Sequence, residues 1–363
     1  MSLCGSGSRD AHERARIAFP AVEVIRDLSA PSAGDSRSVL TIGMYDGVHV
    51  GHRTVIAQVR ERAAATGARS VVVTFDRHPM SIVRPGAEPR LLTTLDQRLE
   101  LLASTGVDAT AVVSFDDAQS HETAPAFVER VIVGALRAEA VIVGSDFHFG
   151  HMRQGNVTLL REMGERHGFT AEPVRLVPRA DGVDEPVSST AIRRALAGGE
   201  IDTANRMLGR PHEIRGTVID GDKRGRTIGF PTANVAVPEG MCIPADGVYA
   251  ALYRRPDGTE RPCAVNIGRR PTFYNDAQHS LIEAHLLDFA GDIYGEAAAV
   301  QFLAFLRSEK RFAGLDELKA QLVLDIEHAR SAVLARRGRL ERAGNRVTGG
   351  GSHRPARNSC PGM

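Results

Sequence analysis

Two histidines, His49 and His52, stand three residues apart in the segment GMYDGVHVGH at residues 43–52. Residues at this spacing share one face of a helix. Two imidazoles at a helix start could contact a nucleotide triphosphate and stabilise the charge that develops on its α-phosphate and on pyrophosphate. Positioning and electrostatics can carry such a transfer without a covalent nucleophile. The residues of this segment predicted to bind a nucleotide are Gly43, Asp46 and Gly51.

A second polar cluster, SSTAIR at residues 188–193, could complete such a site. Ser188, Ser189 and Thr190 place hydroxyl groups at a helix start, where they suit a phosphate chain. Arg193 follows within a turn and could add a charged hydrogen bond. Plainer interpretations stay open. The histidine pair could be a helix cap, or part of a zinc site for which no third ligand is evident nearby, and SSTAIR could be an ordinary capped helix.

A glycine-rich basic segment, GDKRGRTIGFPTAN, occupies residues 221–234. Backbone N–H groups of such a loop can cradle phosphates, although the G-K-[ST] ending of a Walker A loop is absent. Thr232 and Asn234 alternate on an extended chain, so both side chains face one way, and their oxygens suit Mg²⁺ beside phosphate oxygens. A polar hairpin is the alternative. The residues of this loop predicted to bind a nucleotide are Gly221, Lys223 and Gly229.

An acidic residue, Glu283, lies in the segment IEAHLLDF at residues 282–289. In a strand it shares a face with His285. A carboxylate there could accept the proton of a substrate hydroxyl. An isolated strand glutamate is more often a solvent-facing acid, so the residue type alone leaves both interpretations open.

The elements that must position these residues change in type along the chain. From residue 38 apolar strands alternate with helices, which is typical of a doubly wound parallel sheet. Ligands bind such a sheet where strands end and helices begin, and residues 43–52 lie at such a point. The strands are expected at 38–43, 70–75, 110–114, 140–144 and 172–177, and the helices at 51–66, 95–104, 124–136, 157–167, 188–196 and 201–208.

After Gly209-Arg210-Pro211 the pattern changes to short strands separated by glycine and proline, which predicts a small antiparallel β-barrel. These strands are expected at 213–219, 248–253, 262–267, 281–287 and 299–306, and an amphipathic helix at 314–336. The composition from residue 344 is typical of a disordered tail. The expected domains are an N-terminal extension at 1–37 with one short element near 22–28, a Rossmann-like α/β domain at 38–208, a barrel domain at 209–340 and a disordered tail at 341–363.

The composition excludes several classes of protein. The 363 residues include 45 Lys and Arg and 44 Asp and Glu, so the net charge of +1 gives no broad field for duplex nucleic acid. No apolar run reaches the ~20 residues of a membrane span. We therefore expect neither nucleic acid nor a membrane as partner. Cys4, Cys242, Cys263 and Cys360 are expected to be reduced, in a cytoplasmic protein without a signal peptide.

The N-terminal motifs resemble the nucleotidyltransferase half of the bacterial bifunctional riboflavin kinase/FAD synthetase family. The segments that carry the resemblance are G-x-(F/Y)-D-G-V-H-x-G-H at 43–52, TFDRHP at 74–79, GSDFHFG at 144–150 and S-S-T-x-I-R at 188–193. The resemblance implies that His49 and His52 contact the ATP phosphates. It further implies that Ser189, Thr190 and Arg193 contact the far end of the triphosphate. It also implies that Asp146 and Phe147 lie on the flavin side of the site.

The C-terminal motifs resemble the flavokinase half of the same family. The matching segments are G-D-x-R-G-R-x-x-G-F-P-T-A-N at 221–234, NIGRRPTF at 266–273 and E-x-H-L-L-D-F…D-x-Y-G at 283–295. The resemblance implies that Thr232 and Asn234 hold Mg²⁺ and ATP phosphates. It implies that Glu283 is the base on the riboflavin 5′-hydroxyl.

By this resemblance the chain is a bifunctional enzyme. It would phosphorylate riboflavin with MgATP to give FMN, and transfer AMP from a second ATP to FMN to give FAD and pyrophosphate. Flavins and ATP are the expected small-molecule partners, Mg²⁺ is the expected metal, and the oligomeric state stays open. Two alternative functions belong to other classes. One is a nucleotidyltransferase for another phosphorylated substrate, which the flavokinase motifs disfavour. The other is a non-catalytic flavin-binding regulator.

The nucleotidyltransferase half departs from the family pattern at four positions. Met44 stands where Asn is usual, Arg77 replaces a Pro, His148 replaces an Arg, and Ala191 stands where Arg is usual. These departures motivate one further alternative, a riboflavin kinase with an inactive or repurposed nucleotidyltransferase domain.

Overall fold

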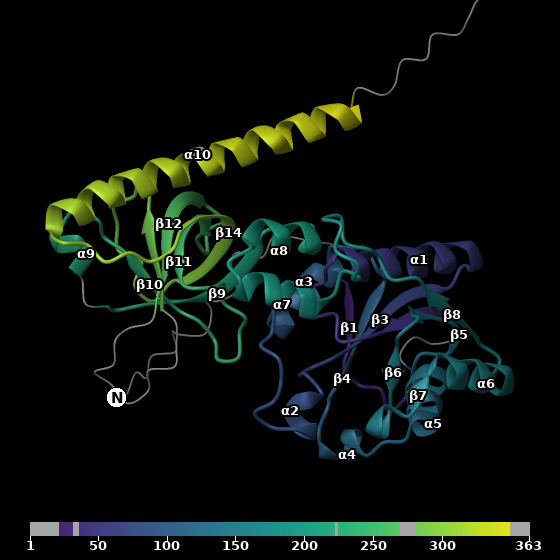
Figure 1. Cartoon of the computed structure of the whole chain (residues 1–363). Coiled ribbons are helices and arrows are strands. Elements are labelled where there is room, and N and C mark those ends of the chain that lie inside the picture. Colours follow the sequence, from purple (N-terminus) through teal and green to yellow (C-terminus); the bar gives the residue numbers. More distant parts are fainter. Residues whose placement is uncertain (1–21, 32–35, 222–223, 269–280, 349–363) are drawn as a thin grey trace, which may run out of the picture.

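The computed structural model describes residues 22–31, 36–221, 224–268 and 281–348. Figure 1 shows a β-sheet and a β-barrel side by side, with α7 (Ser189–Ala197) and α8 (Ile201–Leu208) between them. The first half of the chain forms the sheet and the second half forms the barrel. The predicted order, an α/β domain followed by an antiparallel barrel with a terminal helix, is confirmed.

Within the described residues the sheet has six strands in the order β1-β4-β3-β2-β5-β8, all of them parallel. These are β1 (Glu23–Ile25), β2 (Ser38–Ile42), β3 (Arg69–Phe75), β4 (Ala109–Val113), β5 (Ala138–Gly144) and β8 (Thr170–Val174). Every residue of β2 and β4 is buried, as expected for parallel strands covered on both faces. The chain runs to one side through β3 and β4 and to the other through β5 and β8. A ligand site is therefore expected at the carboxyl end of β2, where the order reverses.

Helices follow most of these strands. They are α1 (Val50–Thr66), α2 (Met80–Val83), α3 (Leu95–Ala103), α4 (Asp117–Ser120), α5 (Ala124–Phe127), the π-helix η1 (Val128–Ala135), the 3₁₀ turn η2 (His151–Arg153) and α6 (Val157–His167). A short hairpin of β6 (His148–Phe149) and β7 (Gly155–Asn156) precedes α6. The single helix predicted at 124–136 is thus divided between α5 and η1, where Leu136 N–H donates to the Val131 carbonyl at 3.0 Å.

The described residues differ from the expected domain limits near both ends. β1 lies in the segment expected to be an extension, yet it pairs with β4 from Glu23 opposite Ala109 and covers the otherwise open edge of that strand. At the other end, α10 (Leu315–Thr348) continues past residue 336. The predicted disorder is wrong for residues 341–348, because Glu341, Arg342 and Ala343 favour a helix strongly enough to outweigh Gly344. Residues 349–363 lie outside the described residues.

The barrel closes in the order β10-β13-β12-β11-β14-β9, and β9 pairs with β10. Its elements are β9 (His212–Ile219), α9 (Arg224–Thr227), β10 (Ala233–Ala236), β11 (Gly247–Arg254), β12 (Glu260–Gly268), β13 (Leu281–Leu286) and β14 (Ala297–Arg307). β10 was expected only as extended chain. α10 packs along β11, β12 and β14. It is fixed to β14 by the buried Asp325 carboxylate, which accepts from Arg307 Nε and Nη2 at 2.9 and 2.7 Å.

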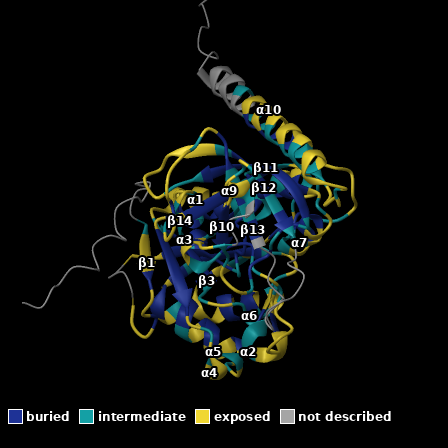
Figure 2. Ribbon diagram, turned by 90° about the vertical axis from the view of Figure 1, so that its left-hand side faces the viewer, coloured by how far each residue is buried: buried dark blue, intermediate teal, exposed yellow. Residues whose placement is uncertain are grey.

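A continuous hydrophobic core joins the two domains. Figure 2 shows buried residues in both the sheet and the barrel. Ile192 and Leu208, from the two helices between the domains, belong to the same apolar cluster as Val300 of the barrel. The backbone also crosses the boundary, since Leu91 N–H donates to the Gly240 carbonyl at 2.7 Å. The predicted boundary at 209–211 is therefore a change of architecture inside one packed unit.

Candidate active sites

The histidine segment forms a tight turn between β2 and α1. Tyr45, Gly47 and Val48 have φ values of 52°, 81° and 39°, so three residues of this turn adopt left-handed backbone. Such strained backbone is typical of functional sites. His49 is the N-cap of α1, and its Nδ1 accepts from the backbone N–H of His52 at 3.3 Å.

The two imidazoles stack on one another. Their ring centroids are 3.5 Å apart and their planes differ by 17°. Burial, followed by the positive charges of Arg210 and Arg193, lowers the pKa of His49 to about 3. Burial and then the charge of His49 also hold the pKa of His52 well below its ordinary value. Both rings are therefore neutral at pH 7, and each can donate or accept one hydrogen bond per nitrogen.

Asp46 lies in the same turn, but its carboxylate is occupied by protein donors. It accepts from the backbone N–H groups of Leu92 and Thr93, both at 3.0 Å, and from Arg193 Nη2 at 2.5 Å. The backbone carbonyl of Asp46 accepts from Ser189 Oγ at 2.8 Å. Asp46 thus holds the turn against the SSTAIR segment, and its carboxylate, 1% exposed, positions Arg193.

The start of α7 lies beside the start of α1. Ser188 caps α7 by accepting from Ala191 N–H at 3.1 Å. A Cβ at Gly51 would lie 3.4 Å from the Val187 carbonyl oxygen and 3.2 Å from the His49 ring. A side chain at Gly51 would therefore crowd the His49 ring and contact the segment that leads into α7. Two helix N-termini, with the exposed Thr190 at one of them, provide N–H groups that suit a phosphate chain.

The structure adds Arg98 and His78, which were not singled out from the sequence as site residues. The buried Arg98 donates from Nη1 to the Met44 carbonyl at 2.8 Å and from Nη2 to the Phe75 carbonyl at 2.7 Å. It therefore ties together the carboxyl ends of β2 and β3. Burial lowers the pKa of Arg98 to about 10. The sequence offered little signal for Arg98, because it is one of four polar residues in the helix LDQRLELLA.

His78 lies in the electrostatic surroundings of Arg193, Asp46 and Arg98. Its ordinary pKa is lowered by burial and then by the charge of Arg193. Its Nδ1 accepts from Met80 N–H at 3.1 Å.

Three of the four departures from the family pattern, at Met44, Ala191 and Arg77, have the following surroundings. Met44 contributes its carbonyl to Arg98, and its sulfur lies 3.4 Å from Arg98 Nη1. Ala191 lies on the buried face of α7. Arg77 is exposed and lies 3.6 Å from the carboxylate of Asp76. None of these contacts displaces the histidine pair from the start of α1.

The predicted flavin-side residues follow β5, the strand next to β2. Phe147 is half-buried and stacks on Phe149, with centroids 5.4 Å apart. Asp146 is exposed, and its carbonyl accepts from His148 Nδ1 at 2.8 Å. The sheet order thus brings this loop to the same edge as the histidine turn.

In the barrel, strand register brings the other predicted residues together. Asn234 of β10 lies directly opposite Glu283 of β13, and Glu283 lies opposite Asn266 of β12. Paired residues point to the same face of a sheet, so these three side chains form one row. The neighbours Ile282 and Ala284 are buried in the barrel core, which places the row on the outer face. Asn266 was not predicted as a site residue.

The glycine-rich loop packs over this row. A Cβ at Gly221 would lie 1.9 Å from Asn234 Nδ2, so only glycine allows the loop to approach the amide. His285 Nδ1 donates to the Pro231 carbonyl at 2.8 Å, which holds the end of the loop on β13. Thr232 is exposed, and Gly229 has a φ of 93°. The predicted phosphate contact Lys223 lies outside the described residues.

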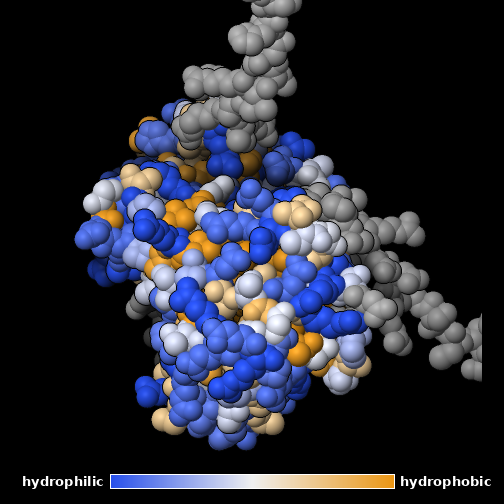
Figure 3. Space-filling view, turned by 90° about the vertical axis from the view of Figure 1, so that its right-hand side faces the viewer, coloured by the Kyte–Doolittle hydropathy of each residue, from blue (hydrophilic) through white to orange (hydrophobic). Residues whose placement is uncertain are grey.

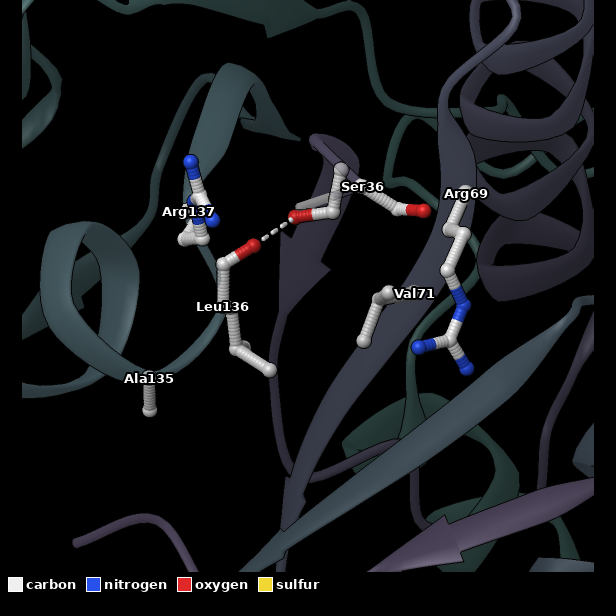
Figure 4. A pocket seen from close by; sticks show the side chains of 7 residues that line it. Ser36, Arg69, Val71, Ala135, Leu136 and Arg137 are labelled. Atoms are coloured by element: carbon white, nitrogen blue, oxygen red, sulfur yellow. Dashed lines mark hydrogen bonds between the residues drawn. The ribbon is translucent and has the colours of Figure 1, made fainter. Parts of the chain in front are cut away.

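The described residues also line two hollows. A groove of about 950 Å³ runs between α3 and the outside of β9, β11 and β14. A much smaller hollow of about 10 Å³ lies where β2 and β3 begin, beside Ser38, whose Oγ donates to the Leu136 carbonyl at 2.6 Å (Figure 4). It has room for one water molecule and lies at the opposite end of the strands from the histidine turn.

The surface and the side-chain composition of the described residues bear on possible membrane and metal binding. The face in Figure 3 is mostly hydrophilic, with hydrophobic residues gathered in its upper half. Across the described parts of the chain, no helix has the length and apolar character needed to span a membrane. The same residues contain no group of three or more His, Cys, Asp or Glu side chains arranged to hold a metal ion.

The chain matches two protein families, one for each domain. Residues 32–191 match FAD synthetase, and residues 208–333 match riboflavin kinase. A solved structure from Streptococcus pneumoniae, titled as a macrolide-efflux protein, has the same fold, with a TM-score of 0.76 and 29% identity over 85% of this chain and 98% of its own.

Curated proteins named bifunctional riboflavin kinase/FMN adenylyltransferase match most of the chain. The Listeria monocytogenes protein is 40% identical over 300 residues, 82% of this chain and 93% of its own. The Pseudomonas fluorescens protein is 41% identical over 293 residues, 81% and 92% of the two chains. The Escherichia coli K12 protein is 40% identical over 302 residues, 83% and 94% of the two chains.

Fold and sites together define a two-domain enzyme for nucleotidyl and phosphoryl transfer. More narrowly, the chain belongs to the bifunctional riboflavin kinase/FMN adenylyltransferase family. It phosphorylates riboflavin to FMN and adenylylates FMN to FAD, as expected from the resemblance. Because both domains match their families, the alternative of a riboflavin kinase with an inactive second domain is not favoured.

Proposed function

We propose that FMN is adenylylated at the histidine turn and that riboflavin is phosphorylated on the outer face of the barrel. One observation supports both assignments. Residues that are scattered along each domain converge on one place in that domain, at the start of α1 and along the row of Asn234 and Glu283. The two reactions then take place on different domains, and FMN leaves one site and diffuses to the other.

At the histidine turn the chain supplies positioning and charge. The neutral His49 and His52 rings and Arg193 contact the phosphates of ATP, and the N–H groups at the starts of α1 and α7 bind further oxygens. A phosphate oxygen of FMN attacks the α-phosphorus, the bond to the β-phosphate oxygen breaks, and pyrophosphate leaves. Asp46 keeps Arg193 in place through their buried ion pair.

On the barrel, Glu283 accepts the proton of the riboflavin 5′-hydroxyl as its oxygen attacks the γ-phosphorus and ADP leaves. The residues present fit a magnesium ion, because the buried amide of Asn234 and the hydroxyl of Thr232 are hard oxygen ligands beside a loop that approaches within contact distance. Asn234 and Thr232 would hold the ion together with ATP phosphate oxygens. When bound, it supplies positive charge to the transferred phosphoryl group.

We also propose that the protein is located in the cytoplasm. The support comes from Cys242 and Cys263, which are buried free thiols, as is usual in a reducing compartment. Cys4 and Cys360 lie outside the described residues.

A time course tests these assignments. Purified protein is incubated with riboflavin and MgATP, and FMN and FAD are separated by chromatography. FMN should form first and FAD later. The Asn234→Ala variant should need at least about tenfold more Mg²⁺ for half-maximal FMN formation, the loss of about one charged contact. FAD formation from added FMN is the internal control. An unchanged Mg²⁺ requirement would show that Asn234 does not hold the metal.

A further inference from the structure

The domain boundary brings the chain at Gly209 and Arg210 close to the start of α1. α8 ends at Leu208, and Gly209 has a φ of 70°, a left-handed conformation that turns the chain towards α1. A Cβ at Gly209 would lie 3.0 Å from Cγ1 of Val50, the first residue of α1. The segment that opens the barrel domain therefore packs against the helix start capped by His49, and Arg210 is its next residue.

Arg210 has no carboxylate partner within the described residues. Its guanidinium makes one hydrogen bond, from Nη1 to the Leu208 carbonyl at 3.4 Å. The acids whose charges act on it are Glu213 and Asp46. Glu213 is paired with two other arginines, and Asp46 is paired with Arg193. The positive charge of Arg210 is therefore left without a direct counter-ion.

This charge lies in the electrostatic surroundings of both histidines. Burial, followed by the charge of Arg53, lowers the pKa of Arg210 to about 10, so the group remains charged at pH 7. Arg210 contributes, after burial, to the low pKa of His49 and also of His52. Together with the buried Arg98, it gives a positive surplus around two neutral rings. A polyanion would neutralise this surplus through charge-assisted hydrogen bonds.

Arg210 is also accessible from the interdomain groove. It lines the groove together with Thr93. Thr93 Oγ1 accepts from the N–H of Gly47 at 3.1 Å, within the histidine turn. Thr93 thus connects the groove that Arg210 lines to the histidine turn.

We propose that Arg210 binds the triphosphate of ATP in the adenylyltransferase site and holds the pyrophosphate as it leaves. This inference rests on the proposed role of His49 and His52 as phosphate contacts. A guanidinium fork can bond two phosphate oxygens at once. Arg210 lies inside the segment that matches riboflavin kinase, so the first residues of the kinase domain complete the site of the other activity.

Substitution of Arg210 tests this role. Arg210→Gln removes the charge, and Arg210→Lys keeps it without the fork. Arg26→Gln is the matched control, because Arg26 is an exposed arginine of the same groove. For each variant we would measure KM for ATP and kcat in FMN adenylylation, the inhibition constant of pyrophosphate, and riboflavin phosphorylation by the same preparation.

Arg210→Gln should raise both KM for ATP and the pyrophosphate inhibition constant about tenfold or more, as expected for one lost charged contact. Arg210→Lys should recover part of this loss. Arg26→Gln and the riboflavin kinase activity of all variants should stay within about twofold of the parent, since none of these changes touches that site.

Two results would overturn the proposal. One is an Arg210→Gln variant with parental KM for ATP and parental pyrophosphate inhibition. The other is a joint decrease in kcat for both activities and in thermal stability, with the pyrophosphate inhibition constant unchanged, which would make Arg210 a structural residue. If the Gln variant does not fold, pyrophosphate inhibition of Arg210→Lys decides. A His52→Ala variant measured in parallel separates the role of Arg210 from the proposed role of the histidines. If His52→Ala kept full FMN adenylylation, the proposed phosphate contact of His52 would itself be wrong.

Discussion

The two active sites of this chain are built by different means. At the histidine turn, polar groups are held by protein partners, as Asp46 holds Arg193 and Arg98 holds the ends of two strands. On the barrel, strand register places Asn234 directly opposite Glu283. Residues 222–223 and 269–280 of this domain lie outside the described part of the chain.

This difference has a consequence for how each site tolerates change. A site fixed by a buried ionic network depends on each of its members, because an unpaired charge in the interior is costly. A site fixed by register keeps its geometry as long as the sheet is intact, so a substitution there removes chemistry with little effect on stability. The following predictions test that distinction.

The largest expected effect is on riboflavin phosphorylation. Glu283→Gln should lower kcat for FMN formation by roughly 10²- to 10⁴-fold, the usual contribution of a general base. FAD formation from added FMN and the melting temperature should stay near those of the parent. Glu239→Gln, an exposed acid of the same domain, is the control. FMN formation at the parental rate would show that Glu283 is not the base.

The next effect is on FAD formation. His52→Ala should lower FMN adenylylation by roughly 10²- to 10³-fold, the cost of one lost group that stabilises transition-state charge. Riboflavin phosphorylation should be unchanged in the same assay. His328→Ala, on the exposed side of α10, serves as the matched control. Loss of both activities would contradict the assignment of the two reactions to separate sites.

Asp46→Asn should reveal the network itself. The substitution leaves Arg193 without its buried partner and should lower the free energy of unfolding by about 3 kcal/mol, together with a loss of FAD formation. Denaturant unfolding measures the first effect. Asp117→Asn, at an exposed position, should change neither. A stability equal to that of the parent would mean that the ion pair contributes little to holding the turn.

The smallest effect per residue is a pH dependence of stability. Burial lowers the pKa of His49 to about 3 and of His212 to about 4, and lowers that of His52 as well. As pH falls below about 6.5, the unfolded chain takes up protons at these histidines while the folded chain does not. Folding stability should therefore decrease by about 1.4 kcal/mol per histidine between about pH 7.5 and pH 5.5.

Urea unfolding at several pH values checks this prediction. His52→Asn should reduce the slope by about one proton while the other two histidines keep their contribution. A slope identical to that of the parent would show that His52 is exposed or already charged in the folded state.

Several features followed directly from the sequence. The alternation of apolar strands and helices to residue 177 predicted the parallel sheet, because each such strand must be covered on both faces. The spacing of His49 and His52 predicted their shared face at a helix start, and the structure places both rings in one stack. Local rules were sufficient for these features because neighbours in the chain determine them.

Other features depended on contacts between distant residues. Nothing local indicates that Asp46 would accept from Leu92 and Arg193, or that Gly209 would pack against Val50 at the start of α1. These contacts arise because the sheet order and the shared core of α7, α8 and the barrel bring separate segments together. The sequence by itself determined which chemical groups are present and the local elements that carry them. The tertiary structure alone decided which groups become partners, since burial and charge pairing depend on packing between segments that the chain order does not join.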